Sequence, residues 1–267
     1  MKHYPLFCVA AAMLFVAAFN IHSAAQVSAA SDASAIVLRA SAQMSKLLDQ
    51  FSNVKCTESV EQVKLRSDGK VELKEASTYD YLAIITGNGG QLSLNESRVA
   101  VRNAKFEKRN TPMLLSNGFA TLFLVFHPYY ADSFHFRITG TALNDGHNLV
   151  KVTFEHIPGT RSPAALALRG REYPLELSGQ AWIDPETGTI SRIAAGIGDT
   201  LQDLGLKSIQ SEVEFAPVSF HNSAESFWLP SAATVEVETP RQHWRNTHRF
   251  TDYKQFSVST EEHVASK

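Results

Sequence analysis

The chain has 267 residues, of which 44% are hydrophobic and 19% charged, with a formal net charge of −2 at pH 7. This composition excludes a disordered or collagen-like chain, and so small a net charge excludes the basic surface that nucleic acid or an anionic membrane requires. The length suits one mainly β domain, since such domains often reach about 200–250 residues.

Residues 1–25 have the features of a secretory signal peptide. Met1 to His3 is a short basic start, Tyr4 to Ile21 is almost uninterrupted apolar, and Ser23 to Ala25 supplies small residues. We predict cleavage near Ala25 and a periplasmic or secreted protein, with an uncleaved membrane anchor as the alternative. No later stretch reaches the ~18–20 apolar residues of a membrane-spanning helix, so none is expected after cleavage.

The rest of the chain divides into a flexible leader at 26–34, a single β domain at 35–258 and a polar tail at 259–267. Cleavage leaves one cysteine, Cys56, so no internal disulfide is expected. A free cysteine is among the most buried residue types, and we expect Cys56 inside a strand, with a reactive or partner-linking thiol as the alternative.

Two helices are expected. Apolar residues recur at helical spacing from Ile36 to Phe51 and predict an amphipathic helix that lies on a sheet. The second helix is predicted from Pro112, with Thr111 as its N-cap, and is ended by His127 and Pro128. It is apolar all round, so it is either buried in a core or plugs an apolar cavity.

Period-2 alternation and turn residues predict about ten strands in antiparallel order. They cover 54–65, 71–86, 92–101, 134–143, 149–157, 175–183, 190–197, 207–220, 227–238 and 244–256. Pro217 breaks the alternation and indicates a bulge or an edge position. Residues 158–174 look irregular, with a short helix at 163–168, and a loop of this length is often a lid.

These elements predict a mainly β (α+β) fold. We expect a curved antiparallel sheet, or half-open β-barrel, with the two helices packed on its concave face.

Two motifs carry a family resemblance. Residues 179–190 read Gly-Gln-Ala-Trp-Ile-Asp-Pro-Glu-Thr-Gly-Thr-Ile, a strand, tight turn and strand, and residues 227–230 read Phe-Trp-Leu-Pro before a late strand. With the signal peptide and the central apolar helix, this layout resembles the LolA/LolB-like outer-membrane lipoprotein-sorting superfamily, in the divergent secreted form typical of acidobacteria. The resemblance implies a half-open barrel lidded by helices, with an apolar cavity for acyl chains.

The aromatic and apolar side chains give the candidate binding site. The expected cavity lining is Tyr79, Tyr81, Leu115, Phe119, Leu122, Phe123, Phe126, Trp182 and Trp228. The alternative is that these residues form a packed core, which is the ordinary fate of one sheet face.

Motifs for catalysis, metals and cofactors are not found. His243 and His248 are five residues apart and therefore face opposite sides of a strand, which makes a poor metal pair. His127 and His135 flank a predicted helix–strand junction but lack further ligands. No nucleophile elbow, zinc helix or phosphate loop is present, so we expect no enzyme, metal or cofactor.

The favoured function is a carrier for a hydrophobic ligand such as a lipid, an acyl chain or a lipoprotein tail. The alternative is a protein-interaction or envelope-sensing module with a filled core and an envelope protein as partner. A secreted hydrolase with a dispersed site is the third hypothesis, and it predicts converging ionisable side chains with shifted pKa values.

Overall fold

The computed structural model describes residues 32–48, 54–88, 91–101, 119–144, 146–168, 171–197, 205–220 and 226–255. The predicted signal peptide and polar tail lie outside these ranges, as do residues 26–31 of the leader and 112–118 of the predicted second helix. No helix among the described residues is long and apolar enough to cross a membrane.

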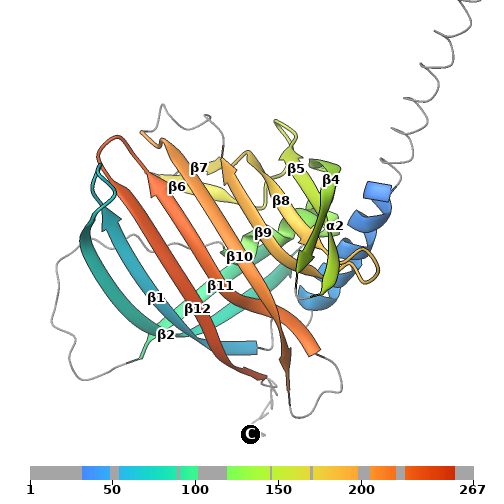
Figure 1. Ribbon diagram of the computed structural model, residues 1–267, viewed down its shortest axis with the longest axis horizontal. Helices are drawn as coiled ribbons and strands as arrows, with labels where there is room; N and C mark the ends of the chain where they lie inside the picture. Colours follow the sequence, from blue (N-terminus) through green and yellow to red (C-terminus); the bar gives the residue numbers. More distant parts are fainter. Residues whose placement is uncertain are drawn as a thin grey trace, which may run out of the picture.

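Ten of the described strands form one open antiparallel sheet (Figure 1), which confirms the predicted fold class. The order is β3-β2-β1-β12-β11-β10-β9-β8-β5-β4, so β3 and β4 form the two edges and the barrel is not closed. The bounds are β1 Val54–Leu65, β2 Val71–Asn88, β3 Gln91–Ala100, β4 Phe134–Asn144, β5 His147–His156, β8 Leu177–Ile183, β9 Ile190–Ile197, β10 Ser208–Ser219, β11 Ser226–Glu238 and β12 His243–Gln255.

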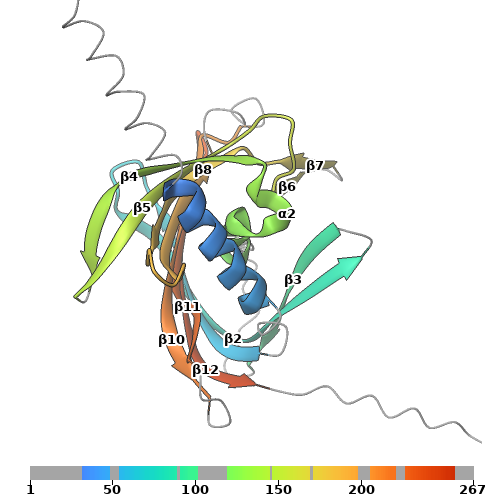
Figure 2. The ribbon, with the colours of Figure 1, turned by 90° about the vertical axis from the view of Figure 1, so that its right-hand side faces the viewer.

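Two helical segments lie on the concave side of the sheet (Figure 2). The N-terminal helix, residues 32–48, buries Ile36, Ala40, Met44 and Leu47, which share one face because they are three or four residues apart. The second segment is the 3₁₀ helix η1, Phe119–Phe126. Both belong to the main hydrophobic core, together with the inward side chains of the sheet.

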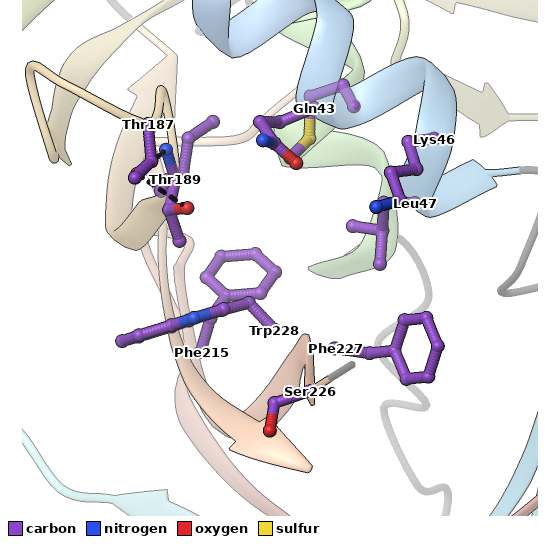
Figure 3. A pocket seen from close by; sticks show the side chains of 11 residues that line it. Gln43, Lys46, Leu47, Thr187, Thr189, Phe215, Ser226, Phe227 and Trp228 are labelled. Carbon is purple, nitrogen blue, oxygen red and sulfur yellow. Dashed lines mark hydrogen bonds between the residues drawn. The ribbon is translucent and has the colours of Figure 1, made fainter. Parts of the chain in front are cut away.

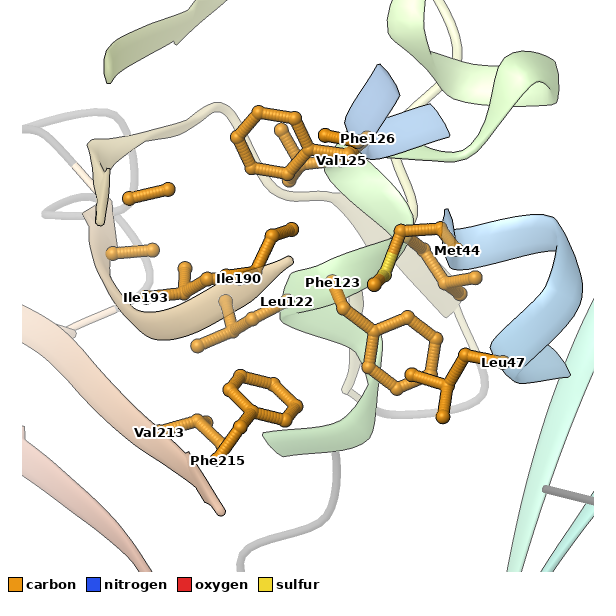
Figure 4. Close-up of a cluster of buried hydrophobic side chains, with 14 of the residues drawn as sticks. Met44, Leu47, Leu122, Phe123, Val125, Phe126, Ile190, Ile193, Val213 and Phe215 are labelled. Carbon is orange, nitrogen blue, oxygen red and sulfur yellow. The ribbon is translucent and has the colours of Figure 1, made fainter. Parts of the chain in front are cut away.

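The contacts of η1 join the N-terminal helix to the sheet. In Figure 4, Phe123 points toward Met44 and Leu47 of the helix, while Leu122 lies beside Phe215 of β10. The Ser41 hydroxyl of the helix donates a 2.6 Å hydrogen bond to the carbonyl oxygen of Phe126. This bond satisfies a carbonyl at the end of η1, where no further helical partner follows.

The second predicted helix is wrong in type, whereas its predicted end at His127 and Pro128 is confirmed, since η1 stops at Phe126. Its described part is a 3₁₀ helix, and a separate short helix, α2 (Pro128–Ala131), follows it. Pro128 begins α2 and does not only end the preceding turn, because proline suits the first helical position. His127 is the N-cap, and its Nδ1 accepts a 3.1 Å hydrogen bond from the Tyr129 backbone N–H.

The short helix predicted at 163–168 is also wrong. Residues Ala165–Leu168 form strand β6, which pairs antiparallel with β7, Arg171–Pro174. Alanine and leucine favour helix, but the ladder to β7 overrides that weak local preference.

The turn between β8 and β9 is held by its own side chains, as the sequence predicts. Asp184 Oδ1 accepts hydrogen bonds of 2.9 Å from the backbone N–H groups of Glu186 and Thr187. Burial tends to raise the pKa of Asp184, but these bonds outweigh it and hold the pKa below its usual range. Gly188 has a φ of +76° and closes the turn with a 2.9 Å bond to the Asp184 carbonyl.

The expected irregularity near Pro217 has two parts. The register between β10 and β11 shifts between Glu214 and Phe215, opposite Ala232 and Pro230, which leaves Ser231 as an extra residue. Pro217 itself pairs with β11, beyond the stretch of β10 that pairs with β9. It therefore sits where β10 is locally an edge, a position that tolerates proline.

Candidate functional site

A pocket of about 360 Å³ lies between the N-terminal helix, the turn after β8, and the facing ends of β10 and β11 (Figure 3). The helix contributes Gln43, Met44, Lys46 and Leu47, the turn and β9 contribute Thr187, Thr189 and Ile190, and the strand ends contribute Phe215, Ser226, Phe227 and Trp228.

The pocket has an apolar floor and a mixed rim. Met44, Leu47, Ile190 and Phe215 are buried and belong to the core, so they form the floor. The rim holds exposed Lys46, Thr187 and Ser226. Trp228 also stands at the rim, and it is 37% exposed although its ring is large and apolar. An aromatic ring exposed beside an apolar floor is an arrangement that favours a ligand with an apolar part.

The neighbouring turn fixes the helix that forms one wall of this pocket. A Cβ added at Gly188 would lie 2.4 Å from the Arg39 backbone carbon, so glycine is what allows the turn to touch the helix backbone. The Asp-Pro-Glu-Thr-Gly sequence therefore has a tertiary role in addition to its local one.

The structure separates the residues that were expected to line one cavity. Leu115 and the side chain of Phe119 lie outside the described residues. Leu122, Phe123 and Phe126 are 0–4% exposed and pack in the core, and none of them lines the pocket. Trp228 does line it.

Trp182 lies on the other face of the sheet, which corrects its expected position. In β8 the buried residues are Leu177, Ala181 and Ile183, so Trp182 has the opposite parity. Its ring is covered by Arg192, whose guanidinium carbon is 4.5 Å from the ring centroid.

Tyr79 and Tyr81 lie on β2, on the concave face at the β3 end of the sheet. Tyr81 is 2% exposed, and Tyr79 is half-buried opposite Glu58. They therefore accompany a different group of side chains, the polar cluster.

The polar cluster consists of Glu58, Glu96, Arg98 and His248. The carboxylate of Glu58 accepts hydrogen bonds from Arg98 Nε and from Nη2, the latter at 2.9 Å, and one from His248 Nδ1 at 2.7 Å. Arg98 Nη1 also donates to Glu96 at 3.0 Å. The side chains of Glu58, His248, Arg98 and Glu96 are 0–5% exposed.

The cluster keeps its charges in pairs. Burial tends to raise the pKa of Glu58, but the hydrogen bonds from His248 and Arg98 outweigh it and hold the pKa below its usual value. Burial would lower the pKa of Arg98, yet the carboxylates of Glu58 and Glu96 raise it above the ordinary range. Arg98 is therefore charged, and Glu58 is ionised and accepts every bond it makes.

Sequence reasoning missed this cluster, although β1 carried a signal. Glu58 lies on the same buried face of the strand as Cys56, Val60 and Gln62, because these residues are two apart. A carboxylate at an inward position of a strand needs a buried partner. The expectation that His243 and His248 face opposite sides is confirmed, since His248 is 1% exposed and His243 is half-exposed beside Glu236.

The cluster meets one condition of the hydrolase hypothesis, since ionisable groups converge with shifted pKa values. The hydrogen bonds described above, however, join members of the cluster to one another, and all four side chains are buried. No group of three or more metal-ligating side chains occurs among the described residues. The arrangement explains structural cross-linking of strands more directly than chemistry on a substrate.

Comparison with family models and with curated proteins finds no match. Among solved structures, a DUF1329 family protein from Desulfovibrio piger has a TM-score of 0.43 at 14% identity, covering 87% of this chain and 98% of that one. A putative outer membrane lipoprotein-sorting protein domain from Vibrio parahaemolyticus has a TM-score of 0.42 at 7% identity, covering 84% and 94%.

The MucA/MucB complex of Pseudomonas aeruginosa has a TM-score of 0.18 at 8% identity, covering 82% of this chain and 99% of that one. At these identities each likeness concerns the fold alone.

Proposed function

We propose that the protein is a periplasmic, non-enzymatic binding protein or carrier for a hydrophobic ligand, such as a lipid, an acyl chain or a lipoprotein tail. The apolar end of the ligand enters the pocket beside the N-terminal helix. The observation that carries this proposal is Trp228, a large ring 37% exposed at the mouth of a pocket with a buried apolar floor.

The size of the pocket limits what it holds. A volume of about 360 Å³ is at the lower end of the ~300–1,000 Å³ of small-ligand sites. It suits the end of one chain better than several acyl chains together. Lys46 and the hydroxyls of Thr187 and Ser226 at the rim offer polar contacts to a head group that remains in water.

The test is to purify the protein natively from a periplasm and identify organic-extractable molecules by mass spectrometry. We expect one amphiphile in near-stoichiometric amount in the wild type. Trp228→Glu should lose it, because the variant places a charge at the mouth of the pocket without opening a hole in the core. Titration with dodecanoate, followed by isothermal titration calorimetry, should show at least about tenfold weaker binding by the same variant.

Leu143→Glu is the matched control. Leu143 is 73% exposed on β4 and does not line the pocket, so this variant makes the same kind of change elsewhere. It should retain the amphiphile and the affinity for dodecanoate. If a folded Trp228→Glu variant retained the amphiphile and the affinity for dodecanoate equally well, the pocket would not be the binding site.

A second candidate function is supported by the core. The described side chains of η1, Leu122 to Phe126, are at most 4% exposed, as expected for a filled core in a protein-interaction module. If natively purified wild-type protein carries no lipid and does not bind dodecanoate, this candidate takes precedence. An envelope protein would then be sought by cross-linking in the periplasm.

A further inference from the structure

The ends of β2 and β3 extend beyond the strand that supports them. β1 pairs with β2 from Leu65 back to Lys55, which lies opposite Leu82. Residues 83–88 of β2 continue past that point and pair with residues 91–96 of β3. Because β3 is the edge of the sheet, these two stretches form a two-stranded ribbon whose ladder bonds, among the described residues, run only within it.

The ribbon leaves the sheet on the side that carries the helices. Figure 2 shows β3 and the end of β2 standing away from β10 to β12, on the far side of the N-terminal helix. A two-stranded ribbon is marginally stable in water unless a third strand or packing supports it. Its position must therefore depend on contacts at its base and along its length.

The contact at the base is the Arg98–Glu58 ion pair. Arg98 is on β3 and pairs with Tyr81 of β2, yet its side chain passes over the Tyr81 ring to reach Glu58 on β1. The guanidinium carbon is 5.0 Å from the ring centroid. Arg98 thus ties β3 to the strand two places away in the sheet.

The same group of bonds reaches both into the sheet and into the ribbon. Glu58 is bonded to His248 of β12 at 2.7 Å, and Arg98 is bonded to Glu96 of the ribbon at 3.0 Å. The side chains of Glu58, Arg98 and Glu96 are at most 5% exposed. Removing one partner of such a buried pair leaves an uncompensated charge, which is strongly unfavourable.

A second contact lies further along the ribbon. The Tyr130 hydroxyl of α2 donates a 3.3 Å hydrogen bond to the carbonyl oxygen of Leu92, and Leu92 packs against the hydrophobic core. At 3.3 Å this hydrogen bond is long, whereas the base has several buried, charge-assisted bonds. Of the contacts described for the ribbon, those at its base are therefore the stronger.

We propose that this ribbon is a flap over the helix-bearing side of the sheet, hinged beside Lys55, where β1 begins. The Arg98–Glu58 ion pair holds the base of the flap, and the hydrogen bond from Tyr130 holds it in the closed position. Opening separates Leu92 from the core while the remaining strands stay paired. The inference does not depend on the pocket beside Trp228, because the flap is at the β3 end and its opening is measured without a ligand.

Hydrogen–deuterium exchange of the full-length protein, read by mass spectrometry, tests the flap. In the wild type, the amides of residues 83–88 and 91–96 should exchange faster than those of β8, β9 and β10. Arg98→Gln should accelerate exchange in the ribbon by about tenfold more than in β8 to β10. Tyr130→Phe should accelerate exchange around Leu92 by about fivefold and leave β1 and β12 unchanged.

Arg192→Gln is the control. Arg192 also pairs with a glutamate, Glu212 at 2.6 Å, but on the outer face with side chains 42% and 37% exposed. It should leave exchange in the ribbon unchanged. Ribbon amides that exchange as slowly as those of β8 to β10 in the wild type would overturn the proposal. Equal acceleration of all strands by Arg98→Gln would also overturn it, and if that variant fails to fold, the wild-type and Tyr130→Phe measurements decide.

Discussion

At the scale of single residues, the notable feature is that charged groups are buried inside a mainly apolar sheet. Glu58 is 0% exposed and His248 is 1% exposed, and they belong to strands that the chain reaches 190 residues apart. Their hydrogen bond can form because β1 and β12 are neighbours in the sheet. The Glu58 carboxylate is stable there because its partners, Arg98 and His248, come from two other strands.

Glu58 predicts how stability depends on pH. Its pKa is lower in the folded protein than its ordinary value of about 4.3, so the unfolded state takes up a proton first as the pH falls. The stabilisation is therefore complete above that ordinary value and is lost as the pH falls through the lowered pKa. Urea unfolding of the wild type from pH 7 to pH 3 should show this loss.

The Glu58→Gln variant isolates the effect, because Asp184 also has a lowered pKa and contributes to the same acid limb. The variant should be less stable by about 3–5 kcal/mol at pH 7, since Arg98 loses its ionised partner. Its stability should fall less steeply with acid than that of the wild type. Parallel curves for the two proteins would contradict the assignment.

Cys56 predicts an unreactive thiol. Its side chain is 5% exposed, and burial raises its pKa to about 12, with the nearby carboxylate of Glu58 adding to the rise. Since the thiolate is the reactive form, alkylation by iodoacetamide at pH 8 should be roughly a thousandfold slower than for an ordinary thiol. Peptide mass spectrometry identifies the Cys56 adduct, and labelling in urea supplies the reference. Rapid labelling of the native protein would support the reactive alternative.

At the scale of elements, turns and helices make tertiary contacts that the sequence pattern alone does not predict. The β8–β9 turn forms from local hydrogen bonds of Asp184, but its position against residues 39 and 40 of the helix is a tertiary contact. The segment from Phe119 to Phe126 is apolar enough for a buried helix, and it is buried, but as a 3₁₀ helix. Local pattern predicts burial better than it predicts helix type.

Gly188 allows the role of the turn to be measured. Gly188→Ala requires a positive φ of an alanine and also places a methyl group 2.4 Å from the helix backbone. Gly146→Ala is the matched control, because Gly146 has a φ of +82° with no atom within 4 Å of the added Cβ. The control should lose about 1–2 kcal/mol in free energy of unfolding, and Gly188→Ala clearly more. Equal losses of unfolding free energy in urea titrations would show that the turn moves away from the helix without a further loss of stability.

At the scale of the whole molecule, the sheet brings the first and last described strands together. β12 lies between β1 and β11, so the last strand is central and pairs with the first along most of its length. The open edges β3 and β4 lie at opposite ends of the order, and the helices fill the concave side between them. The pocket and the flap are consequences of this open, curved arrangement.

The amino-acid sequence by itself determined the strands of the main sheet, the turn at Asp184, and the burial of the first helix. Each depends on residues close together in the chain: alternation for strands, turn chemistry for hairpins, and spacing of three or four for a helix face. The mainly β fold follows from their number and order.

Only the tertiary structure decided which distant strands pair and what lies on each face. It placed Trp182 outside, Trp228 at a pocket and Phe123 in the core, and it joined Glu58 to His248 and Arg98. Such pairings depend on the curvature of the sheet and on which strands become neighbours. Neither can be predicted from the local sequence pattern around one residue. The pairing of β1 with β12 joins residues that are far apart in the sequence, and it depends on burial of the whole concave face of the sheet.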